Sequence, residues 1–228
     1  MILSRIKAAY FAVEFIISIL FVVFFMWLFK NNIRNIRRIW AKTQRFFGFY
    51  SIKIEAEFNQ NANMIIMNHQ SMLDIVALEE VHPKNLCWIA KKEIGEIPII
   101  GKILSLPKMI AVDRESKHSL VKLVKEAQDR VNSGRVLAIF PEGTRSQTDT
   151  LLPFKGGAKI IVDRLNLKVQ PIVIVGSDIM DVKKFRFKNG EIKIICLDVV
   201  DTSDKNWLEI TREKMQKVLD KERNTSKS

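Results

Sequence analysis

Residues 64–74 of the chain are MIIMNHQSMLD: four apolar residues, a polar turn that contains a histidine, and the start of another apolar segment. A short apolar run between polar residues is typical of a buried strand. Similar runs recur along the chain, each bounded by polar residues, glycine or proline. The six runs predicted as strands are Met64–Met67, Leu86–Ala90, Met109–Val112, Val136–Phe140, Val169–Val175 and Ile192–Val200.

Segments with helical periodicity separate several of these runs. Ser119–Val131 places its apolar residues on one helical face, and Gly157–Leu165 and Lys205–Leu219 have similar patterns. Strands that alternate with helices predict an α/β domain, with a mixed, largely parallel sheet flanked by helices.

The N-terminus is far more apolar than the rest of the chain. Residues 8–29 are AAYFAVEFIISILFVVFFMWLF, 22 residues with a single charge at Glu14. A bilayer core needs roughly 20 apolar residues in a helix, and the run ends without the small-residue cleavage site of a signal peptide. We therefore expect a membrane-anchoring helix that stays on the protein. A buried core helix is the alternative. A spanning helix and a hairpin that dips into one leaflet both fit the pattern.

The chain is strongly basic, with 37 Lys and Arg against 25 Asp and Glu and a net charge of +12. This excess favours an anionic membrane surface or nucleic acid. The apolar N-terminus, and the lack of a recognisable base-reading module, favour the membrane and argue against nucleic acid.

A basic, amphipathic segment follows the apolar run. In residues 31–49, Ile, Trp and Phe alternate with Arg and Lys, which predicts an amphipathic helix lying on lipid headgroups. Basic residues are denser here than before the apolar run, which favours a cytoplasmic position for the domain that follows, at an inner membrane or endomembrane. We expect residues 1–49 to form the anchor and interfacial helix, and residues 50–228 to form the folded domain. The basic residues of this cluster are Lys30, Arg34, Arg37, Arg38, Lys42 and Arg45.

His69 and Asp74 follow a predicted strand, where functional side chains of open α/β sheets gather. Five residues span about 500° of helix, so the two cannot share one helical face. They can meet if His69 lies on the turn before a helix and Asp74 lies in its early turns. The carboxylate would then accept the imidazole Nδ1–H, leaving Nε2 to take a proton from a substrate hydroxyl. A loop histidine next to an unrelated helix-start aspartate is the alternative.

Residues 140–146, FPEGTRS, also follow a predicted strand. Pro141 would end the strand, and Gly143 permits a tight turn. The Thr144 hydroxyl and the Arg145 fork suit a phosphate monoester. An ordinary polar turn with a solvated arginine is the alternative.

Further cationic residues follow two other predicted strands. Lys91 and Lys92 end one strand, and Arg114 follows another, so their charges could join the same sheet edge. Between them, Ile94–Leu106 could line a tunnel for an apolar chain or form a core helix. No Cys/His cluster has metal-binding spacing. The two cysteines, Cys87 and Cys196, are expected to be reduced.

Taken in order, these blocks resemble the motifs of the 1-acyl-glycerol-3-phosphate acyltransferases. The resemblance covers residues 63–175, and its specificity comes from the H-x4-D block followed by FPEGTRS. The matching blocks are NHQSMLD (68–74), KKEIGEIPIIG (91–101), AVDR (111–114), FPEGTRS (140–146), PFKGGA (153–158) and VQPIVIV (169–175).

The resemblance implies transfer of a fatty acyl group from acyl-CoA or acyl carrier protein to lysophosphatidic acid in the bilayer, giving phosphatidic acid without a cofactor or metal. It implies that His69 is the general base and Asp74 its partner, and backbone N–H groups near His69 are candidates for stabilising the oxyanion. The implied acceptor-binding residues are Glu142, Gly143, Thr144 and Arg145, with Arg145 on the phosphate and further charge from Lys91, Lys92 and Arg114.

Two alternatives stay open at this point. The acceptor could be glycerol 3-phosphate or another lysophospholipid. The chain could also be a non-catalytic protein that binds anionic lipid.

Overall fold

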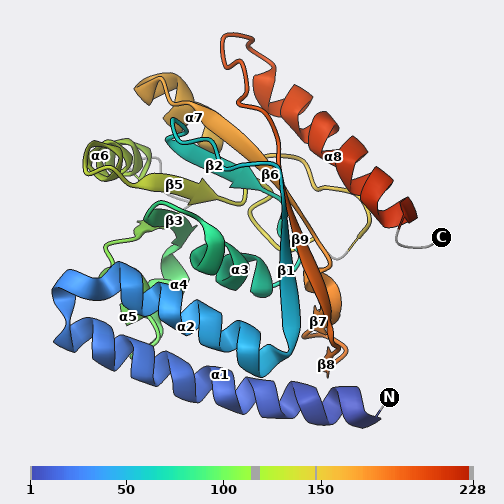
Figure 1. Ribbon diagram of the computed structural model, residues 1–228. Coiled ribbons are helices and arrows are strands. Elements are labelled where there is room, and N and C mark those ends of the chain that lie inside the picture. The colour runs from blue at the N-terminus through green and yellow to red at the C-terminus, as the bar shows by residue number, and fades with distance from the viewer. Residues whose placement is uncertain (1, 114–118, 147, 226–228) are drawn as a thin grey trace.

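The computed structural model describes residues 2–113, 119–146 and 148–225. Its centre is a seven-stranded sheet with the strand order β1-β9-β6-β2-β5-β3-β4 (Figure 1). The strands are β1 (Tyr50–Glu55), β2 (Met64–Met67), β3 (Leu86–Lys91), β4 (Ile110–Val112), β5 (Val136–Ile139), β6 (Val169–Val175) and β9 (Gly190–Cys196). The strands β7 (Met180–Asp181) and β8 (Arg186–Phe187) form a separate pair.

The sheet is mixed and largely parallel, as predicted. Strands β6, β2, β5, β3 and β4 are parallel neighbours, whereas β9 runs antiparallel to β6 and parallel to β1. The carboxyl ends of β6, β2, β5, β3 and β4 therefore meet at one edge, where the polar segments after these strands begin.

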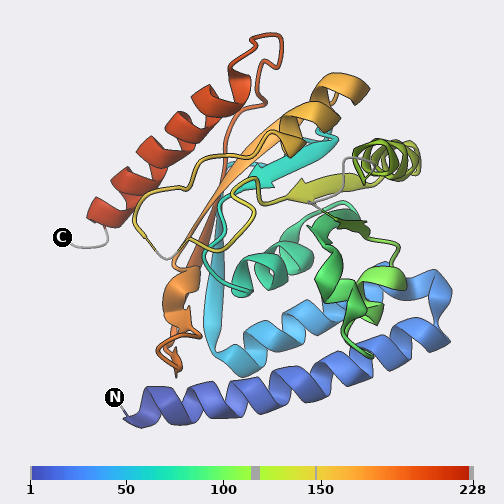
Figure 2. The same ribbon diagram turned by 180° about the vertical axis from the view of Figure 1, so that it is seen from behind.

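Helices cover both faces of the sheet (Figures 1 and 2). Because side chains alternate along a strand, Ile65 and Met67 of β2 pack into the core on one face, and Met64 and Ile66 pack into the core on the other. The first face carries α1 (Ile2–Leu28), α2 (Ile33–Gly48) and α3 (Leu73–Val81). The second carries α6 (Ser119–Asn132), α7 (Gly157–Leu165) and α8 (Trp207–Thr225).

Short elements complete the fold. The segment Ile94–Leu106 is not a core helix: it contains the end of α4 (Lys92–Glu96) and all of α5 (Lys102–Ser105), and Ile99 between them is 59% exposed. Two 3-10 helices are η1 (Lys30–Asn32) and η2 (Ser177–Ile179). Both cysteines are free and buried, as expected.

Helices α1 and α2 form an antiparallel hairpin that lies along the domain (Figure 1). Among the described residues, α1 is the helix that is long and apolar enough to cross a membrane. One of its faces is buried against the rest of the fold, and the opposite face is exposed. The buried residues are Phe11, Phe15, Ile19, Val22, Val23 and Met26.

Helix α2 turns arginines toward the protein. Arg37 pairs with Glu79 of α3, Arg38 donates to the Glu80 carbonyl oxygen at 2.9 Å, and the Arg45 Nε lies 2.8 Å from the Glu80 carboxylate. Arg34 donates to the carbonyl oxygen of Pro83, just after α3. Acidic side chains of α3 and the backbone carbonyl groups of Glu80 and Pro83 therefore bind these arginines. The prediction that the basic residues lie on lipid headgroups is wrong for Arg37, which is buried, whereas Arg38 remains exposed.

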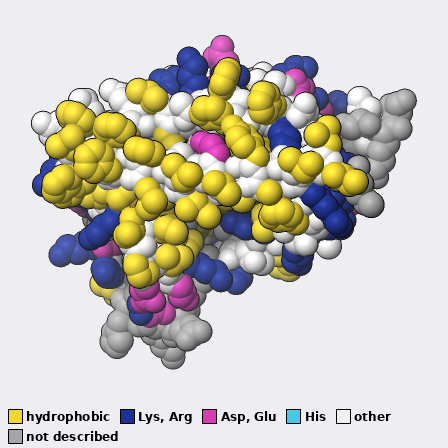
Figure 3. Space-filling model, turned by 90° about the horizontal axis from the view of Figure 1, so that it is seen from below, with side chains coloured by type: hydrophobic (Ala, Val, Ile, Leu, Met, Phe, Trp, Pro, Cys, Tyr) yellow, Lys and Arg dark blue, Asp and Glu magenta, His cyan; other side chains and the backbone are white. Residues whose placement is uncertain are grey.

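The outward side of the hairpin is apolar (Figure 3). An open groove of about 1180 Å³ runs between α1 and α2 and is lined almost entirely by hydrophobic residues. We call six of its exposed apolar residues the outer patch: Ile17, Phe21, Phe25, Phe29, Ile39 and Phe47.

Candidate active site

The structure brings His69 and Asp74 together between β2 and α3. His69 lies on the turn after β2, and Asp74 lies in the first turn of α3 with no exposed surface. Asp74 Oδ2 is 2.9 Å from His69 Nδ1 and accepts the backbone N–H groups of Gln70 at 2.8 Å and Ser71 at 2.9 Å. A carboxylate at a helix N-terminus is also favoured by the helix dipole.

This contact determines which imidazole nitrogen can act on a substrate. A carboxylate only accepts hydrogen bonds, so Nδ1 of His69 carries the proton toward Asp74. Nε2 is then left with its lone pair. A neutral imidazole held in this tautomer can take a proton, and the nearby carboxylate stabilises the imidazolium that forms.

Glu142 fixes the backbone of His69 from the neighbouring strand end. Its Oε1 accepts the His69 N–H at 2.8 Å, and its Oε2 accepts the Leu152 N–H at 2.9 Å. The Ser146 N–H donates to the His69 carbonyl oxygen at 2.7 Å. Burial raises the pKa of Glu142, and the two N–H donors oppose that rise. Glu142 is 1% exposed, so its carboxylate serves the backbone of the site.

Asn68 fixes the same turn from the other side, which the sequence did not indicate. Its side-chain amide donates to the Ile174 carbonyl oxygen at 2.8 Å, and its Oδ1 accepts the Ile174 N–H at 2.7 Å. This reciprocal pair ties the end of β2 to β6. The sequence feature that could have indicated this role is an amide side chain directly after a buried strand, because a buried amide needs hydrogen-bond partners.

The FPEGTRS turn presents Arg145 to a cavity beside the His69 turn. Gly143 has a φ of +74°, the conformation for which glycine was predicted, and Thr144 and Arg145 are exposed. The cavity has a volume of about 250 Å³. It is lined by Gln70, Ser71, Met72, Arg145, Ser146, Thr148, Asp149, Asp178, Met180, Asp181, Val182, Lys183, Lys184 and Arg223.

The other predicted cations are arranged differently. Lys91 is exposed at the end of β3, and Lys92 pairs with Asp113 at 3.3 Å. Neither lysine is among the described residues that line the cavity beside Arg145. Arg114 lies outside the described residues.

The backbone N–H groups nearest to His69 are already used. Those of Gln70 and Ser71 donate to Asp74, and that of His69 itself donates to Glu142. The expectation that amides of this turn stabilise an oxyanion is wrong for these three residues, since each N–H has one proton and a carboxylate holds it. Within the described ranges, no group of three His, Cys, Asp or Glu side chains is placed to hold a metal ion.

An α/β sheet with a His–Asp pair beside an arginine-lined cavity fits an acyltransferase. Residues 49–175, more than half of the chain, match the family model described as Acyltransferase.

Two proteins of similar sequence indicate which kind of acyltransferase this chain is related to. A 1-acyl-sn-glycerol-3-phosphate acyltransferase of Helicobacter pylori is 38% identical over 222 residues, covering 94% of this chain and 92% of that protein. One of Cocos nucifera is 37% identical over 65% of this chain, which spans 49% of that longer protein. The chain belongs to the 1-acyl-sn-glycerol-3-phosphate acyltransferase family.

A solved structure shares the fold. The crystal structure of the 1-acyl-sn-glycerophosphate (LPA) acyltransferase PlsC from Thermotoga maritima superimposes with a TM-score of 0.80. It covers 97% of each chain at 20% sequence identity. The long N-terminal helix is therefore part of a shared architecture.

Proposed function

We propose that the protein transfers a fatty acyl group from an acyl thioester to the free hydroxyl of 1-acyl-glycerol-3-phosphate, giving phosphatidic acid. The observation that carries the proposal is the His69 Nδ1–Asp74 Oδ2 contact of 2.9 Å, on a turn that also borders the Arg145 cavity. The activity named for the Helicobacter pylori relative, with which the chain aligns over almost its whole length, supports it.

His69 performs the proton transfers. Nε2 takes the proton of the acceptor hydroxyl as its oxygen attacks the thioester carbonyl carbon. The C–S bond of the tetrahedral intermediate then breaks. The leaving thiolate takes the proton from the imidazolium, so the free thiol and the neutral imidazole are restored. Asp74 stays ionised and keeps the ring in one tautomer throughout.

Arg145 binds the acceptor phosphate. It is exposed at the cavity, and its planar guanidinium can donate two parallel hydrogen bonds to phosphate oxygens. Thr144 adds a hydroxyl next to it. The exposed Lys91 contributes charge to the same sheet edge, whereas Lys92 is held by Asp113. Glu142 acts as a positioning residue, because its oxygens are occupied by backbone N–H groups.

The hairpin of residues 1–49 holds the catalytic domain of residues 50–228 at a bilayer. Its outer patch is exposed, and Arg37 and Arg45 of α2 are paired with acidic residues of α3. Burying the patch in lipid therefore removes apolar surface from water without desolvating those two charges. Both helices lie in one leaflet, since α1 packs along the domain instead of leaving it. The cytoplasmic position of the domain then rests mainly on the exposed Lys30, Arg38 and Lys42.

The test measures thiol release by the purified full chain in mixed micelles of lysophosphatidic acid, with acyl-CoA and acyl carrier protein as alternative donors. Phosphatidic acid is identified by mass spectrometry. We expect turnover that falls to background in His69→Ala, while the melting temperature stays within a few degrees of the wild type. Equal turnover in this variant, or glycerol 3-phosphate as the better acceptor, would reject the proposal.

A further inference from the structure

Three nearly parallel rings run from the proposed catalytic base into the sheet. The His69 and Phe140 ring centroids are 3.8 Å apart, with an angle of 15° between the planes. The Phe140 and Trp88 centroids are 5.5 Å apart, with an angle of 19°. Trp88 lies in β3 and Phe140 directly follows β5, the neighbouring strand. The imidazole therefore has an aromatic face behind it as well as a carboxylate at Nδ1.

The Trp88 end of this ring stack is fixed by a hydrogen bond. The indole Nε1–H of Trp88 donates to Glu79 Oε1 at 2.5 Å. Glu79 lies on α3, the helix that also carries Asp74. Trp88 is 6% exposed, so its indole N–H needs a partner inside the protein, and Glu79 is that partner.

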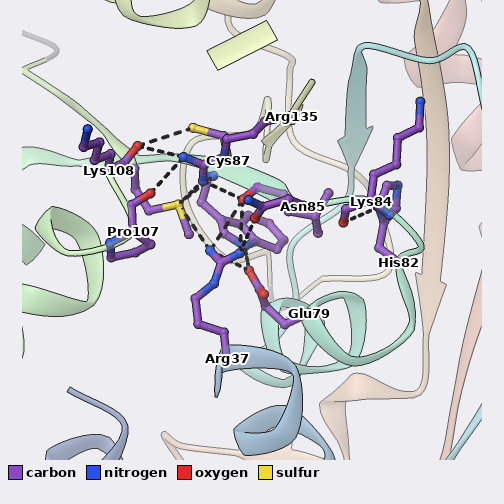
Figure 4. Close-up of polar contacts among 12 residues, drawn as sticks. Arg37, Glu79, His82, Lys84, Asn85, Cys87, Pro107, Lys108 and Arg135 are labelled. Carbon is purple, nitrogen blue, oxygen red and sulfur yellow. Dashed lines mark hydrogen bonds and ion pairs between the residues drawn. The ribbon is translucent and has the colours of Figure 1, made fainter. Parts of the chain in front are cut away.

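Glu79 is in turn paired with Arg37 of α2 (Figure 4). The two side chains are 3.4 Å apart and each is 8% exposed. Arg37 also donates to Asn85 Oδ1 at 2.7 Å, so its guanidinium is held by α3 and by the segment before β3. Helix α2 carries part of the outer patch, and this arginine connects it to the ring stack.

A buried ion pair of this kind is poorly explained by stability alone. The cost of desolvating two charges offsets much of their attraction, and an apolar pair of similar size often stabilises a core as well. What the ion pair adds is a fixed orientation of the Glu79 side chain, which holds the Trp88 ring in turn. The single hydrogen bond to Asp74 leaves the imidazole free to tilt about that bond, and the flat face of Phe140 blocks the tilt.

We propose that Arg37, Glu79, Trp88 and Phe140 are positioning residues for His69, through which the seating of α2 on α3 sets the orientation of the imidazole. The chemical part of this inference rests on the proposed function, in which His69 is the base. It adds that the helix at the membrane surface and the catalytic ring are connected through named contacts.

The hairpin offers a matched control. Arg45 and Glu80 form a second ion pair between the same two helices, at 2.8 Å. Among the described residues, neither forms a hydrogen bond or ion pair with His69, Phe140 or Trp88. The test compares the doubly neutral variants Arg37→Gln/Glu79→Gln and Arg45→Gln/Glu80→Gln, because neutralising both partners leaves no unpaired buried charge.

Two measurements are made on each variant. We expect the Arg37/Glu79 variant to lose about tenfold in kcat with the KM of both substrates within twofold of the wild type, as for a misoriented base. The control variant should keep its kcat. In proton NMR spectra, the ring of Phe140 should shift the His69 imidazole resonances upfield; the chain has three histidines, so His69→Ala assigns them. We expect this upfield shift to be smaller in the Arg37/Glu79 variant and unchanged in the Arg45/Glu80 variant.

Substitutions of Phe140 keep the test decisive if the ion-pair variant does not fold. Phe140→Leu keeps apolar bulk without a flat ring and should lower kcat about tenfold, whereas Phe140→Tyr should retain most activity. Adding the Arg37/Glu79 change to Phe140→Leu should cost little more, because both act through one ring stack.

The outcomes separate this inference from the proposed function. An active wild type with unchanged kcat and an unchanged His69 shift in the variants overturns the inference and leaves the function standing. An inactive wild type whose His69 shift still depends on Arg37 and Glu79 overturns the function and supports the positioning role. Equal losses in both ion-pair variants would reduce the contacts to ordinary packing and overturn the inference.

Discussion

Asp74 carries more of the site than its contact with His69. One of its oxygens accepts three N–H groups, two of them from the backbone of the turn that holds the histidine. The carboxylate therefore shapes the turn and selects the tautomer together. The geometry is in place before a substrate binds, which lowers the ordering cost of the reaction.

Asp74→Asn separates the geometry of the turn from its negative charge. All three N–H groups contact one oxygen, so an amide oxygen in the same place keeps the turn and the tautomer, but the amide has no negative charge to stabilise the imidazolium that forms. We expect a folded protein whose kcat falls by about 10² to 10⁴, with a melting temperature close to the wild type. Thiol release and thermal unfolding check this. A kcat within tenfold of the wild type would contradict it.

Arg145→Lys tests the phosphate contact. Lysine keeps the charge but loses the planar pair of donors, so we expect the KM for lysophosphatidic acid to rise about tenfold or more. The KM for the acyl thioester should change little. Arg212→Lys on α8, whose arginine pairs with Glu209, is the control. A parallel rise in both KM values would show that Arg145 does not bind the acceptor phosphate.

Some site residues could be predicted from the sequence and others could not. His69, Asp74 and Arg145 stand directly after strand-like runs, and residues after parallel strands share one sheet edge. Asn68 and Glu142 stand in the same blocks, but their partners are backbone groups of Ile174 and Leu152, which no local pattern specifies. Phe140 was predicted only as the end of a strand.

At the scale of elements, α2 shows where sequence patterns fail. Its amphipathic pattern was recognised, yet the direction of its charged face depends on Glu79 and Glu80, some forty residues away in the sequence. A basic face is compatible with lipid headgroups or with an acidic helix, and the sequence does not choose between them. Strand β1 was missed because the predicted strands were mostly continuous apolar runs, whereas residues 50–55, YSIKIE, alternate apolar and polar residues, as suits a strand at the edge of a sheet.

The end of α3 contains a group that makes stability depend on pH. His82 is 5% exposed, and burial lowers its pKa from 6.5 to about 4. Between these values the unfolded chain binds a proton that the folded one does not. The contribution of His82 to the free energy of unfolding is therefore fully present above about pH 6.5. As pH falls toward 4, the free energy of unfolding decreases by on the order of 3 kcal/mol.

His82→Asn should remove this dependence. We expect the melting temperature of the wild type in detergent to fall more steeply between pH 7 and pH 4.5 than that of the variant, whatever their difference at pH 7. Parallel curves would show that His82 takes up no extra proton on unfolding. Such a result would leave the proposed activity unaffected.

Across the whole molecule, the net charge of +12 is a poor guide to how the protein binds a membrane. Arg37 and Arg45 of α2 are paired with acidic residues of α3, and the surface of the hairpin that faces outward is apolar. We expect binding to vesicles of neutral phosphatidylcholine that persists at high salt, because hydrophobic burial is not screened.

Ile39→Glu places a charge in the outer patch at a side chain that is 63% exposed. We expect it to weaken sedimentation with vesicles severalfold without lowering the melting temperature. Val121→Glu is the matched control, because Val121 is 77% exposed on α6, on the opposite face of the sheet. Equal losses in the two variants, or none in Ile39→Glu, would show that the hairpin is not the membrane-binding surface.

The domain pattern was only partly visible in the sequence. The apolar N-terminus and the α/β region differ sharply in composition, which supports a boundary near residue 50. The structure nevertheless gives α1, α2 and the sheet one continuous core, with Phe11, Ala41 and Ile65 in the same cluster. The composition of a segment reflects whether lipid or water surrounds it. The core, in contrast, depends on contacts between segments that are distant in the sequence.

The inverted polarity of α2 has a practical consequence. The residues that make the protein hard to handle in water and the residues that hold its hairpin in place occupy opposite sides of the helix. Polar replacements at Ile39 and Phe47 of α2, together with Phe21 of α1, should therefore yield a detergent-free form for crystallography and inhibitor screening. The arginine face would remain untouched in such a form.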